Sequence, residues 1–92
     1  MIIRTQVLPM QKVDWDGHFL TIEMVVQGQT ITCRVSRNTI DNMALYRDFI
    51  SREIALHKNE IALRLQSAIL RKVDSARSTL FELLAEDLEH AN

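Results

Sequence analysis

The stretch DNMALYRDFISREIALHKNEIALRLQSAILRK, residues 41–72, decides the fold of this chain. It contains no Gly and no Pro, and its apolar residues recur at steps of three and four, the spacing of an amphipathic helix. One apolar row is formed by Tyr46, Ile50, Ile54, His57, Ile61, Leu65, Ala68 and Ile69. A second row, at steps of seven, is formed by Phe49, Leu56, Leu63 and Leu70. The pattern predicts a long helix, over about 46–72, with a wide apolar face that needs a cover.

The segment before this helix has the alternation of a β-hairpin. Apolar and polar side chains alternate over residues 20–25 and again over 31–36, which predicts two strands. A two-residue loop at Gln27-Gly28 would pair Ile22 with Cys33 and place both apolar rows on one face. We therefore expect a tight hairpin with Gly28 at a positive-φ position.

Helix and turn signals flank the hairpin. Ser36 has a hydroxyl that can accept from backbone N–H groups two or three residues on, so it is predicted to cap a short first helix over about 37–45. Residues 2–8 are predicted to form an N-terminal edge strand, followed by a connection over 10–14 and a turn over 14–17.

The last part of the chain is ambiguous. Leu80, Leu83, Leu84 and Leu88 fit one face of a helix, and periodicity alone favours that structure. Residues 79–83 also alternate well enough for a strand.

Composition limits the class of protein. The chain has 92 residues, of which 47% are hydrophobic and 25% charged, as in an ordinary globular domain. Its net charge of -1 provides no global field that would attract nucleic acid or an anionic membrane. No window approaches the roughly 18 apolar residues of a membrane span. We expect one domain, residues 1–92, that does not enter a membrane.

Cysteine content and the N-terminal sequence bear on the compartment. Cys33 is the single cysteine, so an intramolecular disulfide is impossible. The first residues lack the apolar region and cleavage site of a signal peptide. We expect a cytoplasmic protein.

A resemblance is carried by Trp15-Asp16, the strand over 19–24, Gly28 and the run Ile31-Thr32-Cys33-Arg34-Val35-Ser36. These features resemble a short bacterial family, domain-of-unknown-function family 1488. The match is most specific over residues 15–36, and the helical region agrees only in pattern. The chain departs from the family in its longer start, in lacking a Gly-containing break between the helices and in its acidic end. The resemblance implies a small fold closed by a strand, which we expect at 79–84, and it implies no activity.

Several residues are weighed as catalytic or metal-binding groups. Cys33 could be a nucleophile only as a thiolate, and its place opposite Ile22 favours a buried, inert thiol. Glu53, His57 and Glu60 share a helix face, but helix-bundle metal sites draw ligands from several helices, so an ion pair is the simpler interpretation. No cofactor signature is present, and we expect a protein that is not an enzyme.

Other residues are weighed as binding groups. Trp15 either closes one end of the core or contributes to an interaction surface. Arg64, Arg71 and Lys72 could contact phosphates, although acidic residues are interspersed and no aromatic platform accompanies them.

The second apolar row of the helix is the most informative functional feature. Leu56, Leu63 and Leu70 at heptad spacing suit a helix–helix contact with a second copy or another protein. Alternatively, they pack on the first helix and the C-terminal segment of the same chain.

These observations together predict an α+β domain in which a small, mostly antiparallel sheet packs against a short and a long α-helix. The sheet would contain an N-terminal strand, the hairpin and a C-terminal strand. The expected function is a non-enzymatic module that forms a homodimer or binds another protein through the helix over 46–72. The alternative is a weak nucleic-acid-associated regulator.

Overall fold

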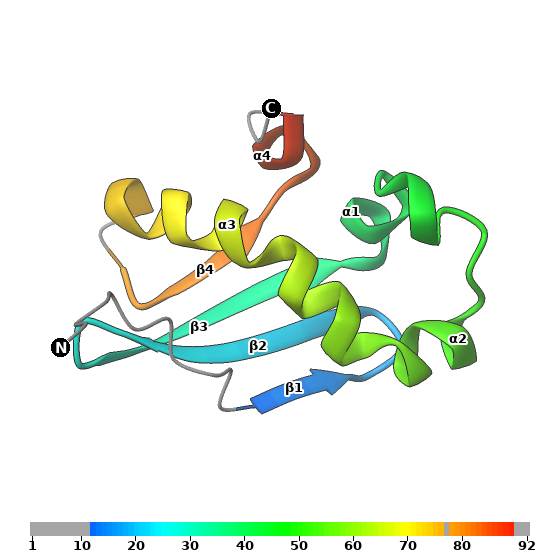
Figure 1. Ribbon diagram of the computed structural model, residues 1–92, viewed down its shortest axis with the longest axis horizontal. Helices are drawn as coiled ribbons and strands as arrows, with labels where there is room; N and C mark the ends of the chain where they lie inside the picture. The colour runs from blue at the N-terminus through cyan, green and yellow to red at the C-terminus, as the bar shows by residue number, and fades with distance from the viewer. Residues whose placement is uncertain (1–11, 77, 90–92) are drawn as a thin grey trace, which may run out of the picture.

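The computed structural model describes residues 12–76 and 78–89 of the chain (Figure 1). Its elements in chain order are β1 (Lys12–Trp15), β2 (Phe19–Val26), β3 (Gln29–Ser36), α1 (Arg37–Asp41), the 3-10 helix η1 (Ala44–Tyr46), α2 (Ser51–Leu56), α3 (Lys58–Ala76), β4 (Leu80–Leu83) and α4 (Ala85–Glu89). The four strands form one sheet in the order β1-β2-β3-β4. The first two pairings are antiparallel and β4 is parallel to β3, which confirms the predicted α+β class.

The predicted hairpin register is confirmed. Ile22 lies opposite Cys33 and Leu20 opposite Val35, so the apolar rows of β2 and β3 share one face. The loop residues Gln27 and Gly28 both have positive φ, 54° and 79°, which is the backbone of a two-residue turn that matches the twist of the strands.

The beginning of the described chain corrects one prediction. Residues 12–14 were expected in a connection, but they belong to β1, because Val13 pairs with Ile22 and extends the apolar face of the sheet. The turn accordingly comes later, at residues 16–18, where the Asp16 carboxylate accepts from the backbone N–H groups of His18 and Phe19, each at 2.8 Å. The strand predicted over residues 2–8 lies outside the described residues.

The first helix begins as predicted but ends earlier. The Ser36 hydroxyl accepts from the Thr39 N–H at 3.2 Å and caps α1. The helix ends at Asp41 instead of continuing to residue 45, and η1 follows as a separate turn. Arg37 donates to the backbone carbonyl of Phe49 at 2.5 Å, so it attaches the connection after η1 to α1.

The long helix differs from the prediction at both ends. It begins at Ser51 instead of about residue 46, because Ile50 is extended and the Glu53 carboxylate accepts from the Ile50 N–H at 2.9 Å. It is interrupted at His57, where φ is −105° and the N–H is shared between two carbonyls. It then continues as α3 to Ala76, beyond the expected end at residue 72.

The strand expected at 79–84 is confirmed as β4, so the helical interpretation is wrong for those residues, whereas the residues that follow form the helix α4. A strand places Phe81 and Leu83 on the same face of the sheet as Cys33 and Val35, their partners in β3. Leu83 is fully buried there, so tertiary pairing overrides the local helical spacing.

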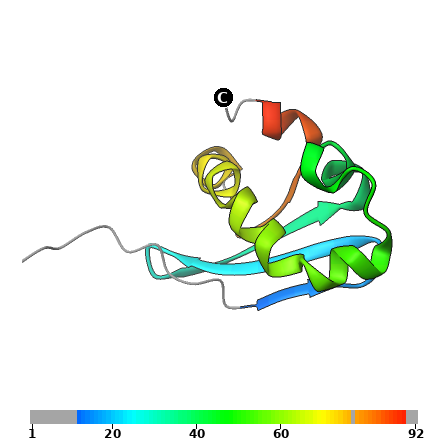
Figure 2. The ribbon, with the colours of Figure 1, turned by 45° about the vertical axis from the view of Figure 1, so that its right-hand side comes forward.

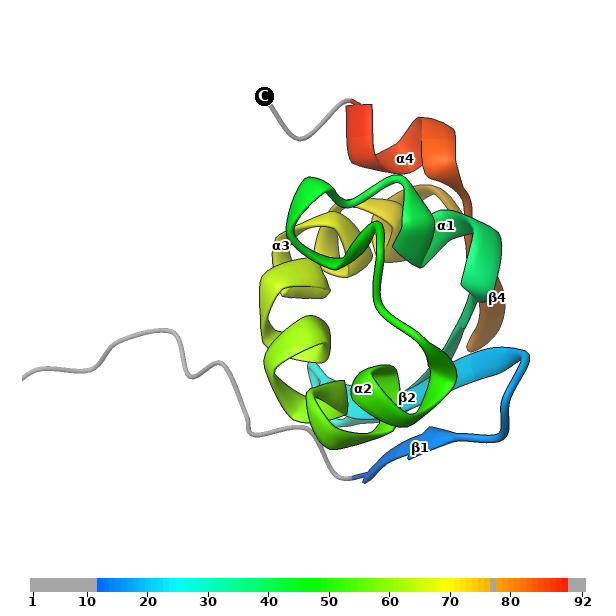
Figure 3. The same ribbon diagram turned by 90° about the vertical axis from the view of Figure 1, so that its right-hand side faces the viewer.

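The helices of the described residues all lie on one face of the sheet (Figures 2 and 3). The core between the layers combines the inner residues of the sheet with the first apolar row of the long helix. From α2 and α3 it receives Ile54, Ile61, Ala62, Leu65, Ala68 and Ile69. Two members predicted for that row lie outside the core: His57 is exposed and Ile50 is 58% exposed at the helix start.

Candidate functional site

Two leucines of the long helix point away from the sheet. Leu56 is 75% exposed and Leu63 is 62% exposed. Each follows a buried isoleucine, Ile54 or Ile61, by two positions, and two positions turn an α-helix by about 200°. Because Ile54 and Ile61 face the core, Leu56 and Leu63 are therefore directed outward.

The exposed surface that contains these leucines is called the leucine face, and it consists of Leu56, Asn59, Glu60 and Leu63. All four are exposed, and they follow one another along α2 and α3. Leu70, which the sequence groups with them, is only half-exposed and packs against the core. The spare apolar surface is thus shorter than the sequence predicts.

A polar cluster surrounds Glu60 of the leucine face. The Glu60 carboxylate accepts from the Tyr46 hydroxyl at 2.5 Å and lies 3.4 Å from Nδ1 of His57 and 3.7 Å from Nε of Arg64. The hydrogen bond from Tyr46, followed by that from His57, lowers the pKa of Glu60. Burial first, and then the bond to Glu60, raises the pKa of Tyr46. This cluster attaches η1 to α3.

The acidic side chain of Glu53 is not part of that cluster. Its carboxylate binds the N–H of Ile50, whereas His57 approaches Glu60. Within residues 12–76 and 78–89, no three His, Cys, Asp or Glu side chains are grouped in a way that could hold a metal ion. The structure therefore does not bring the sequence trio Glu53, His57 and Glu60 together as a ligand set.

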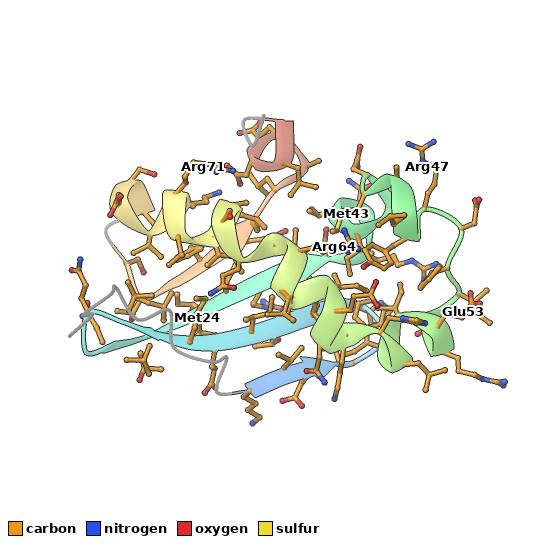
Figure 4. All side chains as sticks on the ribbon, viewed as in Figure 1. Met24, Met43, Arg47, Glu53, Arg64 and Arg71 are labelled. Carbon is orange, nitrogen blue, oxygen red and sulfur yellow. The ribbon has the colours of Figure 1, made fainter. Side chains whose placement is uncertain are left out.

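The three basic residues weighed as phosphate contacts do not form one patch. Arg64 approaches Glu60, and Lys72 contacts Asp87 of α4 at 2.7 Å. Arg71 is exposed and lies in the C-terminal half of α3, about two helical turns after Arg64 (Figure 4). Sequence reasoning missed the role of Lys72, because its partner lies fifteen residues away on a different element.

Cys33 is fully buried on the inner face of β3. Burial raises the pKa of its thiol to about 12, so the thiolate required of a nucleophile is scarce near neutral pH. The environment matches the interpretation of Cys33 as a small hydrophobic core residue.

Trp15 is half-buried at the end of β1 and packs against the core. Its indole N–H donates to the Ser51 hydroxyl at 2.8 Å, which joins the first strand to the start of α2. This contact lets the ring close one end of the core while its polar atom stays satisfied.

Two further findings concern membrane-spanning helices and similarity to known proteins. Among the described residues, no helix combines the length and the apolar character needed to cross a membrane. No family model, curated protein or solved structure matches the chain. The function must therefore be inferred from the residues described above.

Proposed function

We propose that this protein is a non-enzymatic, cytoplasmic module that self-associates through the leucine face. The single observation that supports the proposal is the exposure of Leu56 and Leu63, two large apolar side chains on the same helix, at 75% and 62%. Their exposure favours an intermolecular contact over the alternative in which they pack within the chain. Membership of family 1488 stays a proposal that rests on residues 15–36.

A symmetric pair is the simplest arrangement for such a surface, because the same helix face then serves both copies. In an antiparallel pair, Leu56 of one copy would approach Leu63 of the other, with Asn59 and Glu60 at the centre. Tyr46 and His57 contact the Glu60 carboxylate, so it enters the contact with hydrogen-bond partners from its own chain.

The size of the surface predicts a weak association. Full burial of a fully exposed leucine side chain contributes about 1.5–3 kcal/mol, so four leucines that are 75% or 62% exposed contribute roughly 4–8 kcal/mol. Association costs about 4–15 kcal/mol in lost translational and rotational freedom. Because these ranges overlap, we expect a dimer that dissociates on dilution.

Light scattering behind size exclusion, over a dilution series, tests the proposal. The unaltered chain should approach twice its 10.7 kDa mass at high concentration. A variant with Leu56→Glu and Leu63→Glu should remain at one chain mass with an unchanged circular dichroism spectrum. The matched control is Leu45→Glu with Leu80→Glu, since both leucines are 60% exposed but lie outside the leucine face.

Two results would overturn the proposal. One is a single-chain mass for the unaltered protein at every concentration. The other is a dimer that persists in the Leu56→Glu, Leu63→Glu variant. Unfolding of that variant would instead assign both leucines to the core of the monomer.

The nucleic-acid alternative draws less support from these contacts. Two of its three residues, Arg64 and Lys72, already lie beside carboxylates, and a phosphate would have to displace those partners. We therefore do not propose it as a second function.

A further inference from the structure

β4 is an edge strand of the described sheet, with β3 on one side. In a ladder of this kind, alternate residues direct their backbone groups to the neighbouring strand. The Thr32 N–H donates to the Thr79 carbonyl at 2.7 Å, so residues 79, 81 and 83 face β3. The backbone groups of Leu80 and Glu82 and the N–H of Leu84 consequently face the open edge, whereas the Leu84 carbonyl accepts from the Asp87 N–H of α4 at 2.9 Å.

Side chains of the same protein bind four of these outward groups, namely both backbone groups of Leu80, the Glu82 carbonyl and the Leu84 N–H. The Ser78 hydroxyl accepts from the Leu80 N–H at 3.2 Å and donates to the Leu80 carbonyl at 2.9 Å. Lys72 donates to the Glu82 carbonyl at 2.9 Å. Asp87 accepts from the Leu84 N–H at 2.7 Å. Ser78, Lys72 and Asp87 are together called the edge clasp.

The clasp is joined across two helices. Lys72 comes from α3 and Asp87 from α4, and their charged atoms are 2.7 Å apart. Both side chains are only 22% exposed, so water and salt screen this pair less than the other ion pairs at the surface. The same contact therefore holds α4 in place and keeps two side chains over the strand edge.

An uncovered strand edge is a template for pairing with another chain. Strand addition at β4 would need the Leu80, Glu82 and Leu84 backbone groups that the clasp binds. Leu80, 60% exposed, and Leu84, 40% exposed, stand at the two ends of this short edge and would supply apolar contacts to an added strand. Without the clasp, the edge would present free backbone groups and exposed apolar side chains, which are the two requirements for pairing with another strand.

We propose that the edge clasp closes β4 to strand addition, and that breaking it turns this edge into a pairing surface for β4 of a second copy. A second copy is the fitting occupant because two identical edges of equal length pair antiparallel about a twofold axis. In that arrangement Leu80 of one copy approaches Leu84 of the other when the pairing is centred on Glu82. The clasp thus restricts contacts between copies to surfaces other than this edge.

A triple variant with Lys72→Met, Ser78→Ala and Asp87→Ala removes the clasp. One positive and one negative charge are lost together, so these three substitutions leave the net charge unchanged. Methionine keeps the apolar stem of Lys72 in place. The variant is placed in the Leu56→Glu, Leu63→Glu background, so that association through the leucine face does not contribute and failure of either proposal can be recognised separately.

The expected result is a mass of at least twice that of one chain, together with an infrared band of intermolecular β-structure. The matched control carries Arg71→Met, Asp74→Ala and Ser75→Ala, which likewise remove one basic, one acidic and one hydroxyl side chain at exposed positions of α3, and it should keep the mass of its background. A folded clasp variant with that same single-chain mass at high concentration would overturn the proposal.

Amide hydrogen exchange in the unaltered protein tests separately whether the clasp is closed in solution. This test also applies if the clasp variant fails to fold. The amides of Leu80 and Leu84 should exchange at least roughly tenfold more slowly than those of the hairpin loop at Gln27 and Gly28. Exchange as fast as in that loop would show that the clasp is open in solution and would overturn the proposal.

Discussion

At the scale of single residues, burial and hydrogen bonding decide what each ionisable group can do. Cys33 lies in the core, where burial favours the neutral thiol and raises its pKa to about 12. Asp16 lies in an exposed turn, where backbone N–H groups of Phe19 and His18 favour the charged carboxylate and lower its pKa. Neither residue shows the combination of access and reactive state that nucleophilic or acid–base catalysis requires.

We predict that a thiol reagent at pH 8 modifies Cys33 only after unfolding. The rise from the ordinary value of 9.0 to about 12 lowers the thiolate fraction roughly a thousandfold, before restricted access is counted. Labelling followed by mass spectrometry measures the effect. A Cys33→Ala chain that also carries Ser67→Cys on the exposed side of α3 is the control and should react while folded. Comparable rates for Cys33 in the folded and unfolded chain would contradict the prediction.

At the scale of elements, end signals and tertiary contacts compete to set helix boundaries. Ser36 begins α1 as its type predicts, because the hydroxyl satisfies an N–H that the helix leaves unpaired. By contrast, nothing in the local spacing marks the start of α2 at Ser51. That boundary depends on Glu53, which binds the Ile50 N–H, and on Arg37, which holds the Phe49 carbonyl.

We predict that Ser36→Ala lowers the free energy of unfolding by about 1 kcal/mol, through loss of the cap on α1. Urea denaturation followed by circular dichroism measures the change, and the slope of the transition should be unaltered. Ser67→Ala, at an exposed position inside α3, is the control and should have little effect. Equal losses in the two variants would contradict a capping role for Ser36.

At the scale of the whole molecule, a few side chains join elements that are distant in the sequence. Tyr46 connects η1 to α3 through Glu60, and Trp15 connects β1 to α2 through Ser51. Thr39 of α1 donates to the Leu83 carbonyl of β4 at 3.2 Å, in the buried part of the structure. These contacts lie in and beside the core and join the helical layer to the sheet.

We predict that the contribution of Glu60 to stability disappears in acid. Its pKa in the folded state is lowered, so the contribution is present above the ordinary value of 4.5 and is lost as pH falls through the folded pKa. Unfolding of Glu60→Gln and of the unaltered protein, compared from pH 7 to pH 2, should show a difference that narrows below about pH 4.5.

The partner of Glu60 supplies the control for that experiment. In a Tyr46→Phe background, the pH-dependent part of the difference should shrink, because the first of the hydrogen bonds that lower the Glu60 pKa is absent. A difference between Glu60→Gln and the unaltered protein that is the same at every pH would contradict the linkage.

The sequence by itself determined the parts of this protein that depend on a short repeating period. The two-residue period of the hairpin fixed which residues of β2 and β3 face the core, since a slip of one residue would divide the apolar rows. The spacing of Ile54, Ile61, Leu65 and Ile69 fixed the buried side of the long helix. The outward position of Leu56 and Leu63 follows from the same geometry, so the candidate surface was largely predictable.

Only the tertiary structure decided the features that join residues far apart in the chain. β4 is a strand because Leu83 fits beside Val35, although its own spacing favours a helix. Leu70 is lost from the second row because it packs against the core. Lys72 contacts Asp87 and the Glu82 carbonyl because the fold brings α4 and β4 beside α3. Local patterns specify which face an element buries, whereas the free energy of packing between distant elements determines where that element begins, what it pairs with and which polar groups meet.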